Sequence, residues 1–197
     1  MLTLFHAPQS RSSRIVWLLE EVGADYVLTI ADIPRQDGTG APDPANPHPD
    51  KKVPALVDDG ALITESIAIV QYLTDKFPAA ALGPQPGEPL RGPYLSWLAY
   101  YAGVMEPVVT FAFSGLADNP ALQRTFRDRG AMDRRVLAAL EAGPYILGEK
   151  FSGADILVAS MGHFARAMLP AGALLDAYLE RCNARPALAR ALAKDRG

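Results

Sequence analysis

Proline divides this chain more sharply than any other residue type. Of the 17 prolines, six lie within residues 34–54 and five within residues 78–93, whereas residues 55–77 contain none. Because proline fixes φ and lacks a backbone N–H, neither a long helix nor a central strand can run through such a cluster. The two clusters therefore divide the chain into segments that must form their secondary structure separately.

The second cluster predicts a stiff linker between two domains, at residues 79–89. We therefore expect a first domain over residues 1–78 and a second over residues 90–197. The first cluster lies inside the first domain. Its residues 34–44 show no hydrophobic period, which predicts a surface loop.

Charge and cysteine content exclude several classes of protein. The 19 Lys and Arg residues against 22 Asp and Glu give a net charge of −3, which disfavours a nucleic-acid or polybasic membrane surface. The single cysteine, Cys182, excludes an intrachain disulfide and a cysteine-based zinc site, and with three histidines we expect no metal. The start of the chain lacks a signal-peptide pattern, and no apolar run reaches the roughly 18 residues that span a bilayer. We expect a cytoplasmic protein with no nucleic-acid or membrane partner.

Hydrophobic periodicity in residues 1–78 predicts a small α/β domain with one sheet. Its opening strand–helix–strand unit implies two parallel strands. Gly23 stands where a helix C-cap is expected, and Asp59-Gly60 is typical of a hairpin between the third and fourth strands. In chain order, the predicted elements are a strand at 2–5, a helix at 12–22, strands at 26–30, 55–57 and 61–63, and a helix at 66–77.

The second domain shows no convincing strand, so we expect it to be all-helical. Its clearest local signal is Ser152 with Asp155, an S-x-x-D form of the capping box, which Phe151 and Ile156 flank as a hydrophobic staple. The predicted helices cover residues 90–114, 121–142, 151–168, 171–183 and 186–194.

The turn at residues 6–14 is the first candidate site. It follows a predicted strand, at the sheet end where open α/β folds place their sites, and it precedes a helix whose N-terminus favours a negative ligand atom. A hydroxyl in this turn could donate to a thiolate and lower the pKa of the thiol. The alternative is that Ser10, Ser12 or Ser13 only caps the helix.

A second candidate is the segment Lys51-Lys52-Val53-Pro54, directly before a predicted strand. If the Val53–Pro54 bond is cis, it turns the Val53 main chain toward solvent, where its N–H and C=O can pair with a peptide-like ligand. The alternative is an ordinary trans proline at the start of a strand.

The third candidate is the segment Thr64-Glu65-Ser66, between a predicted strand and a helix. The Ser66 hydroxyl and the first helical N–H groups would form a carboxylate pocket, and Glu65 beside it would bind an ammonium group. Together they suit the head group of an amino acid, which carries both charges. The alternative is that Ser66 caps the helix and Glu65 is solvated.

Four segments in this order resemble the cytosolic glutathione transferases over nearly the whole chain. Residues 10–21, SRSSRIVWLLEE, are similar to the first helix of a fungal and bacterial serine-type subgroup. HPDKKVP at residues 48–54 resembles that subgroup's His-Pro-x-Gly-Lys-x-Pro loop, with Lys51 in place of the usual Gly. Glu65-Ser66 matches the glutathione-binding pair, and residues 151–155 match the capping box of the helical domain.

The resemblance implies a thioredoxin-like N-terminal domain, an all-helical C-terminal domain and glutathione as co-substrate. The serine at position 10 would stabilise the glutathione thiolate, although the register leaves Ser10 and Ser12 both open. The Val53 main chain, before Pro54, would pair with the cysteinyl backbone, and Lys52 would bind the glycine carboxylate. Glu65 and Ser66 would hold the γ-glutamyl head.

A pocket for hydrophobic substrates is also implied. It would lie between the turn at residues 6–10 and the predicted helix that contains Tyr100, Tyr101, Met105 and Phe111. The alternative is that these four side chains belong to the core of the helical domain.

The implied activity is transfer of the glutathione thiolate to a hydrophobic electrophile, as in detoxification, by a homodimer. Arg11 stands where related subgroups carry a cysteine, which argues against chemistry that needs a protein thiolate. Two alternatives remain open, namely a non-catalytic glutathione-binding or carrier protein and a glutathione-dependent peroxidase, because a fold does not guarantee an activity.

Overall fold

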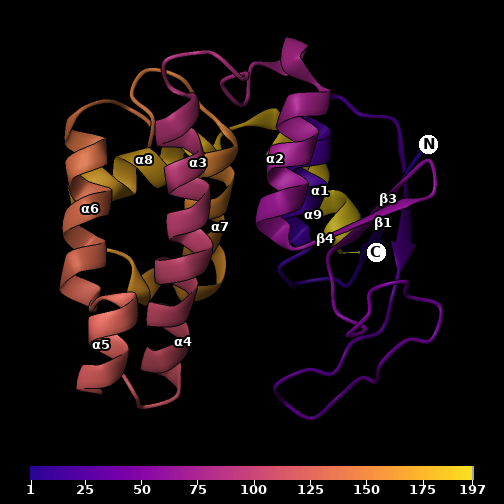
Figure 1. The fold of residues 1–197 in the computed structure, drawn as a ribbon, viewed down its shortest axis with the longest axis horizontal. Helices are drawn as coiled ribbons and strands as arrows, with labels where there is room; N and C mark the ends of the chain where they lie inside the picture. The colour runs from indigo at the N-terminus through magenta and orange to yellow at the C-terminus, as the bar shows by residue number, and fades with distance from the viewer. Residues whose placement is uncertain (197) are drawn as a thin grey trace. The chain divides into compact units, whose positions relative to one another are not determined.

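The computed structural model describes residues 1–196, which divide into two compact units. The first unit contains residues 1–80 together with the C-terminal segment from Arg185, and the second contains Ala81–Ala184. Figure 1 shows the course of the chain through both units.

The first unit is built on one mixed, four-stranded sheet in the order β2-β1-β3-β4. β1 and β2 are parallel, and β3 is antiparallel to both β1 and β4. Every element begins and ends within one residue of its predicted limits. The elements are β1 (Leu2–His6), α1 (Ser13–Val22), β2 (Tyr26–Ile30), β3 (Ala55–Asp58), β4 (Ala61–Thr64) and α2 (Ser66–Lys76).

The core of the first unit lies between the sheet and α1. Ile15, Leu18 and Leu19 of α1 are fully buried, as are Leu4 and Leu56 of the sheet. Gly23 follows α1 with φ at +65° and its N–H bonded to the Leu19 carbonyl, which is the C-cap geometry that the sequence predicted.

The C-terminal helix α9 (Pro186–Asp195) belongs to the first unit, whereas the sequence-based division placed it in the helical domain. It lies beside α1 (Figure 1) and buries Ala187, Leu188 and Ala191. Residue 197, the predicted end of the domain, lies outside the described residues.

Ion pairs add to the apolar contacts between α9 and α1. Arg185 donates to both carboxylate oxygens of Glu21, at 2.5 and 2.7 Å, and Arg190 and Lys194 pair with Glu20 at 3.0 and 2.5 Å. Matching charges across two helices, far apart in sequence, are not visible in the periodicity of either helix alone.

The second unit is helical, as predicted, and its helices are α3 (Arg91–Tyr100), α4 (Glu106–Phe113), α5 (Pro120–Phe126), α6 (Arg129–Glu141), α7 (Gly153–Ala165) and α8 (Ala173–Asn183). A π-helical segment, Tyr101–Met105, joins α3 to α4, so the predicted helix at 90–114 is continuous but not regular. The predicted helix at 121–142 is instead two helices. Arg127 takes a φ of +77°, and Asp128 caps α6 by accepting from the Ala131 N–H at 2.7 Å.

Two of the four side chains predicted either as substrate pocket or as core are core residues. Tyr101 and Met105 are buried within the second unit. Tyr100 is half-buried and its ring lies 3.9 Å from the Arg135 guanidinium, while Phe111 packs edge-on against Phe126.

The predicted capping box at the start of α7 is confirmed. The Ser152 N–H and hydroxyl donate to Asp155 Oδ2 at 2.8 and 2.9 Å, and the Ile146 N–H donates to Oδ1 at 2.8 Å. Asp155 is fully buried, so its carboxylate connects the helix start to the preceding loop inside the core.

Among residues 1–196, no helix combines the length and the apolarity that crossing a membrane requires. The same part of the chain contains no group of three or more His, Cys, Asp or Glu side chains placed to hold a metal ion.

Candidate active site

The sheet topology brings the three candidate segments to one end of the first unit. β1 and β4 run in the same direction, and β3 between them runs in the opposite one, so the ends of β1 and β4 meet the start of β3. A cavity of about 410 Å³ opens there. It is lined by Arg11, His48, Asp50, Lys52, Val53, Pro54, Glu65 and Ser66.

Five of the six predicted site residues line this cavity. Lys52, Val53 and Pro54 reach it from the start of β3, and Glu65 and Ser66 reach it from the end of β4. The Val53–Pro54 bond is cis, which is the first of the two possibilities that the sequence left open. Ser10, the sixth, is not among the lining residues, although its neighbour Arg11 is.

The loop before Val53 is held by Asn46, which sequence reasoning missed. Asn46 is fully buried; its amide donates to the Lys52 carbonyl at 2.9 Å and accepts from the His48 N–H at 3.0 Å. Lys51 Nζ donates to the Asn46 carbonyl at 2.7 Å. An Asn directly before a proline favours a turn, and this dipeptide is the sequence signal that points to Asn46.

Glu65 adopts an unusual backbone conformation, with φ at +67° and ψ at +120°. Such a conformation in a residue with a side chain costs on the order of 1–3 kcal/mol and is concentrated at functional sites. Glu65 is also the N-cap of α2, so the expectation that Ser66 caps this helix is wrong, since Ser66 is its first residue. The Glu65 side chain makes no capping bond and is exposed at the cavity.

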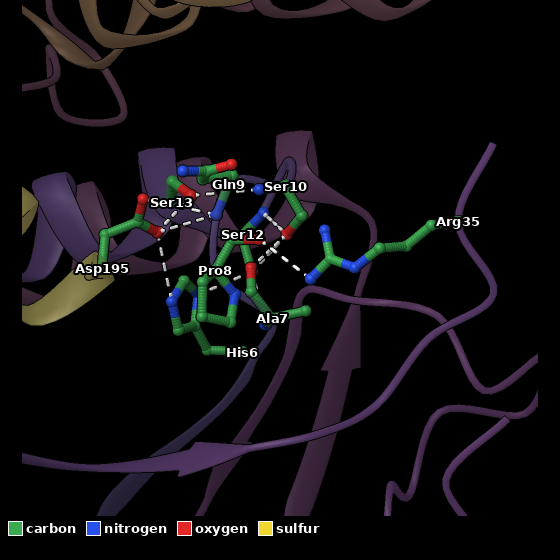
Figure 2. Close-up of polar contacts among 9 residues, drawn as sticks. All are labelled: His6, Ala7, Pro8, Gln9, Ser10, Ser12, Ser13, Arg35 and Asp195. Carbon is green, nitrogen blue, oxygen red and sulfur yellow. Dashed lines mark hydrogen bonds and ion pairs between the residues drawn. The ribbon is translucent and has the colours of Figure 1, made fainter. Parts of the chain in front are cut away.

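The serines of the turn form a hydrogen-bonded group rather than a helix cap (Figure 2). Ser12 is the N-cap of α1, yet its hydroxyl makes no capping bond. Instead Ser12 Oγ lies 2.7 Å from both His6 Nδ1 and Ser10 Oγ, and it accepts from the Ala7 N–H at 3.1 Å. Ser10 Oγ also donates to the Ala7 carbonyl at 2.7 Å. Ser12 is fully buried and Ser10 half-buried, so Ser10 is the more accessible of the two hydroxyls.

Asp195 of α9 supports the other side of this turn, and sequence reasoning missed it. Its carboxylate accepts from the Ser13 hydroxyl at 2.5 Å and from the Gln9 N–H at 3.3 Å. An acidic residue in the last turn of a helix interacts unfavourably with the helix dipole, and this mismatch is the sequence signal that points to a special role for Asp195. From the opposite side, Arg35 Nη2 donates to the Pro8 carbonyl at 3.1 Å, as Figure 2 also shows.

The charges that line the cavity are divided in a way that suits a zwitterionic peptide. Arg11 and Lys52 present two cations, and Asp50 and Glu65 present two anions. Arg11 belongs to the turn after β1, which is two strands away from Glu65 at the end of β4. A ligand that spans this sheet end therefore meets different charges along its length.

Comparison with known proteins identifies the family to which this chain is similar. Residues 1–75 match the model of the glutathione S-transferase N-terminal domain. Glutathione S-transferase 3 of Schizosaccharomyces pombe is 42% identical over 77 residues, which are 39% of this chain and 31% of that protein.

Two solved structures cover the whole fold. A glutathione S-transferase from Actinobacillus pleuropneumoniae is 30% identical, with a TM-score of 0.81 over 100% of this chain and 94% of the other. A sphingomonad glutathione S-transferase in complex with glutathione is 28% identical, with a TM-score of 0.75 over 98% of each chain. By full-length similarity in sequence and fold, this chain is a member of the glutathione S-transferase family.

Proposed function

We propose that this protein transfers the thiol of glutathione to hydrophobic electrophiles. The observation that carries the proposal is the cavity at the sheet end, where cis Val53–Pro54, Lys52, Glu65 and Ser66 converge. Glutathione has an extended peptide main chain, two carboxylates and one ammonium group, and the cavity offers a partner for each.

The order of the strands supports one orientation of the peptide. The cysteinyl backbone pairs with the Val53 main chain at the middle of the site, as an added strand does. The γ-glutamyl head lies over the end of β4, where Glu65 binds its ammonium and Ser66, at the N-terminus of α2, binds its carboxylate. Lys52 binds the glycine carboxylate.

This orientation directs the thiol toward the turn after β1, and we assign the serine that acts on it as Ser10. A thiol with a pKa near 8.5 is only a few per cent thiolate at pH 7. The Ser10 hydroxyl and the N-terminus of α1 favour the anion, and a fall of one pKa unit corresponds to about 1.4 kcal/mol. The thiolate then attacks an electrophilic carbon that the protein holds nearby.

Conjugation of a chloronitroaromatic by the wild type and by Ser10→Ala tests this assignment. We expect Ser10→Ala to lose activity by about tenfold at neutral pH, because the thiol regains roughly one pKa unit. The loss should shrink as the pH rises past the pKa of the thiol. Full activity of Ser10→Ala at pH 7 would show that the assignment is wrong, and Ser12→Ala in parallel distinguishes the two hydroxyls. An assay with an organic hydroperoxide distinguishes transferase from peroxidase activity.

We also propose a detoxifying role in the cytoplasm and a homodimeric state, in line with membership of the family. Light scattering at micromolar protein concentration should then give twice the mass of one chain. A monomer under those conditions would contradict the dimer without touching the proposed chemistry.

A further inference from the structure

A continuous row of polar atoms leads from the turn into the interior of the first unit (Figure 2). Ser10 Oγ lies 2.7 Å from Ser12 Oγ, which lies 2.7 Å from His6 Nδ1. On the other side of the ring, His6 Nε2 lies 3.2 Å from Asp195 Oδ1. His6 and Ser12 are 0% exposed and Asp195 is 7% exposed, so only the Ser10 end of the row approaches solvent.

Burial favours the neutral imidazole of His6 in the free protein. Burial lowers the pKa of His6, and the opposing effect of the Asp195 carboxylate does not overcome it. Of the other charged groups near the row, Arg35 binds the Pro8 carbonyl and Lys194 is paired with Glu20. A neutral ring beside a carboxylate carries its hydrogen on Nε2, which leaves Nδ1 to accept the Ser12 hydroxyl proton.

The contact between His6 and Asp195 is incomplete. Nε2 is buried and makes no aligned hydrogen bond, although Asp195 Oδ1 is only 3.2 Å away. Buried polar atoms are rarely left in this state, and hydrogen bonds at catalytic sites are often poorly aligned before the substrate binds. An imidazolium at this position would gain an ion pair with Asp195, which offsets part of the cost of burying its charge.

Asp195 itself occupies an unfavourable position for a carboxylate. It is nearly buried and ends α9, where the helix dipole already places partial negative charge. A positive charge beside Asp195 would offset both the desolvation of its carboxylate and its repulsion by the helix dipole. A histidine oriented by a carboxylate and bonded to a hydroxyl is the arrangement that activates nucleophiles in unrelated enzymes.

We propose, on the basis of the glutathione site assigned above, that His6 accepts the proton of the glutathione thiol through Ser10 and Ser12. The S–H bond breaks and its electron pair stays on sulfur. The thiol proton moves to Ser10 Oγ, the Ser10 proton to Ser12 Oγ, and the Ser12 proton to His6 Nδ1. Asp195 is the positioning residue that holds the ring and compensates its new charge.

The transfer reverses the direction of every hydrogen bond in the row. In the free protein the Ser10 hydroxyl donates to the Ala7 carbonyl. For the transfer this hydroxyl turns to Ser12 Oγ, so that both hydroxyls donate inward toward His6. After it, Nδ1–H donates to Ser12, Ser12 donates to Ser10, and Ser10 donates outward to the thiolate. The same step therefore forms the nucleophile and directs the Ser10 hydroxyl to stabilise it.

Counting protons tests the proposal in a way that a structural role for His6 would not affect. Glutathione is titrated calorimetrically at pH 7 in two buffers of different ionisation enthalpy, and thiolate is measured by its ultraviolet absorbance. S-methylglutathione, which has no ionisable thiol, gives the baseline. In the wild type we expect close to zero protons released per thiolate formed, because the proton stays on the protein. Release of about one proton per thiolate would overturn the proposal.

Variants assign the acceptor. In His6→Asn, whose amide can still bond Ser12 but cannot be protonated, we expect either about one proton released per thiolate or no thiolate at all. Asp195→Asn should also raise the ratio toward one. The control His163→Asn removes an exposed histidine of the second unit and should match the wild type. A wild-type ratio in His6→Asn would exclude His6 as the acceptor, and a wild-type ratio in Asp195→Asn would exclude the role of Asp195.

A measurement on the wild-type protein does not depend on whether any variant folds. Nitrogen NMR of the histidine-labelled protein should show His6 as the Nε2–H tautomer when free and as imidazolium when saturated with glutathione. A ring that stays neutral in the complex would overturn the proposal. If neither glutathione nor S-methylglutathione binds, the proposed function fails. That outcome differs from a protein that binds glutathione but releases the thiol proton or keeps His6 neutral, which overturns only the proton-transfer proposal.

Discussion

Replacing Asp155 by alanine lowers the free energy of unfolding of the second unit by about 3 kcal/mol, which is the largest stability effect that we expect from a single polar side chain here. The carboxylate accepts three hydrogen bonds, from the Ile146 N–H, the Ser152 N–H and the Ser152 hydroxyl. Alanine leaves these three donors buried without a partner, and each such donor costs about 1–3 kcal/mol. The cost is reduced because the buried carboxylate no longer has to be desolvated.

Urea unfolding measures this effect if one unit is observed at a time. Trp17 lies in the first unit and Trp97 in the second, so Trp17→Phe leaves Trp97 as the reporter of the second unit. Asp176→Ala in the same background is the matched control. It removes an exposed carboxylate paired with Arg166, which is worth at most about 1 kcal/mol. If Asp155→Ala and Asp176→Ala lower the free energy of unfolding equally, burial is not the reason for the effect of Asp155.

The same carboxyl predicts a dependence on pH. Burial raises the pKa of Asp155 to about 6, although its hydrogen-bond donors act in the opposite direction. The folded chain therefore binds a proton that the unfolded chain does not bind between pH 6 and pH 4. Stability from this group is present below about pH 4 and is lost as the pH rises through about 6. The difference in stability between wild type and Asp155→Ala should thus grow by about 2 kcal/mol from pH 7 to pH 4. A difference that does not change with pH would contradict the raised pKa.

Replacing Glu65 by glutamine weakens glutathione binding by about 30-fold, or about 2 kcal/mol, which is the typical worth of a charge-assisted hydrogen bond. Glutamine keeps the size of the side chain and one acceptor oxygen, so it removes the charge and little else. Glu65 reaches the cavity from a residue held at a φ of +67°, which indicates that the fold maintains this placement at some cost in stability.

A glutathione analogue without the ammonium group makes this test specific. Glutaryl-cysteinyl-glycine has the same main chain and thiol but no amino group. If Glu65 binds the ammonium, Glu65→Gln weakens glutathione far more than it weakens the analogue, and the two changes are not additive. Asp25→Asn is the control, because Asp25 is exposed before β2, at the opposite end of the sheet. If Glu65→Gln weakens the binding of both peptides equally, Glu65 does not bind the ammonium group of glutathione.

Local sequence patterns predicted most of the cavity. Val53, Pro54, Glu65 and Ser66 each lie at the boundary of an element, and alternation, turn residues and helical spacing locate such boundaries from neighbours a few residues away. Once the boundaries are known, the order of the strands brings them to one end of the sheet. The cis bond at Pro54 was only one of two possibilities, because local sequence rarely decides it.

The amino-acid sequence by itself determined the elements of the first unit, the helical nature of the second, the capping box at Ser152 and the segments that form the cavity. All of these follow from contacts between residues close together in the chain. Only the tertiary structure decided that α9 packs on α1, that Asp195 reaches His6 and Ser13, and that the serines of the turn bond one another instead of capping a helix. Asp195 and His6 are separated by nearly the whole chain, and no periodicity connects such positions. Their pairing arises because burial of α9 and its ion pairs with Glu20 and Glu21 fix where its last residue lies.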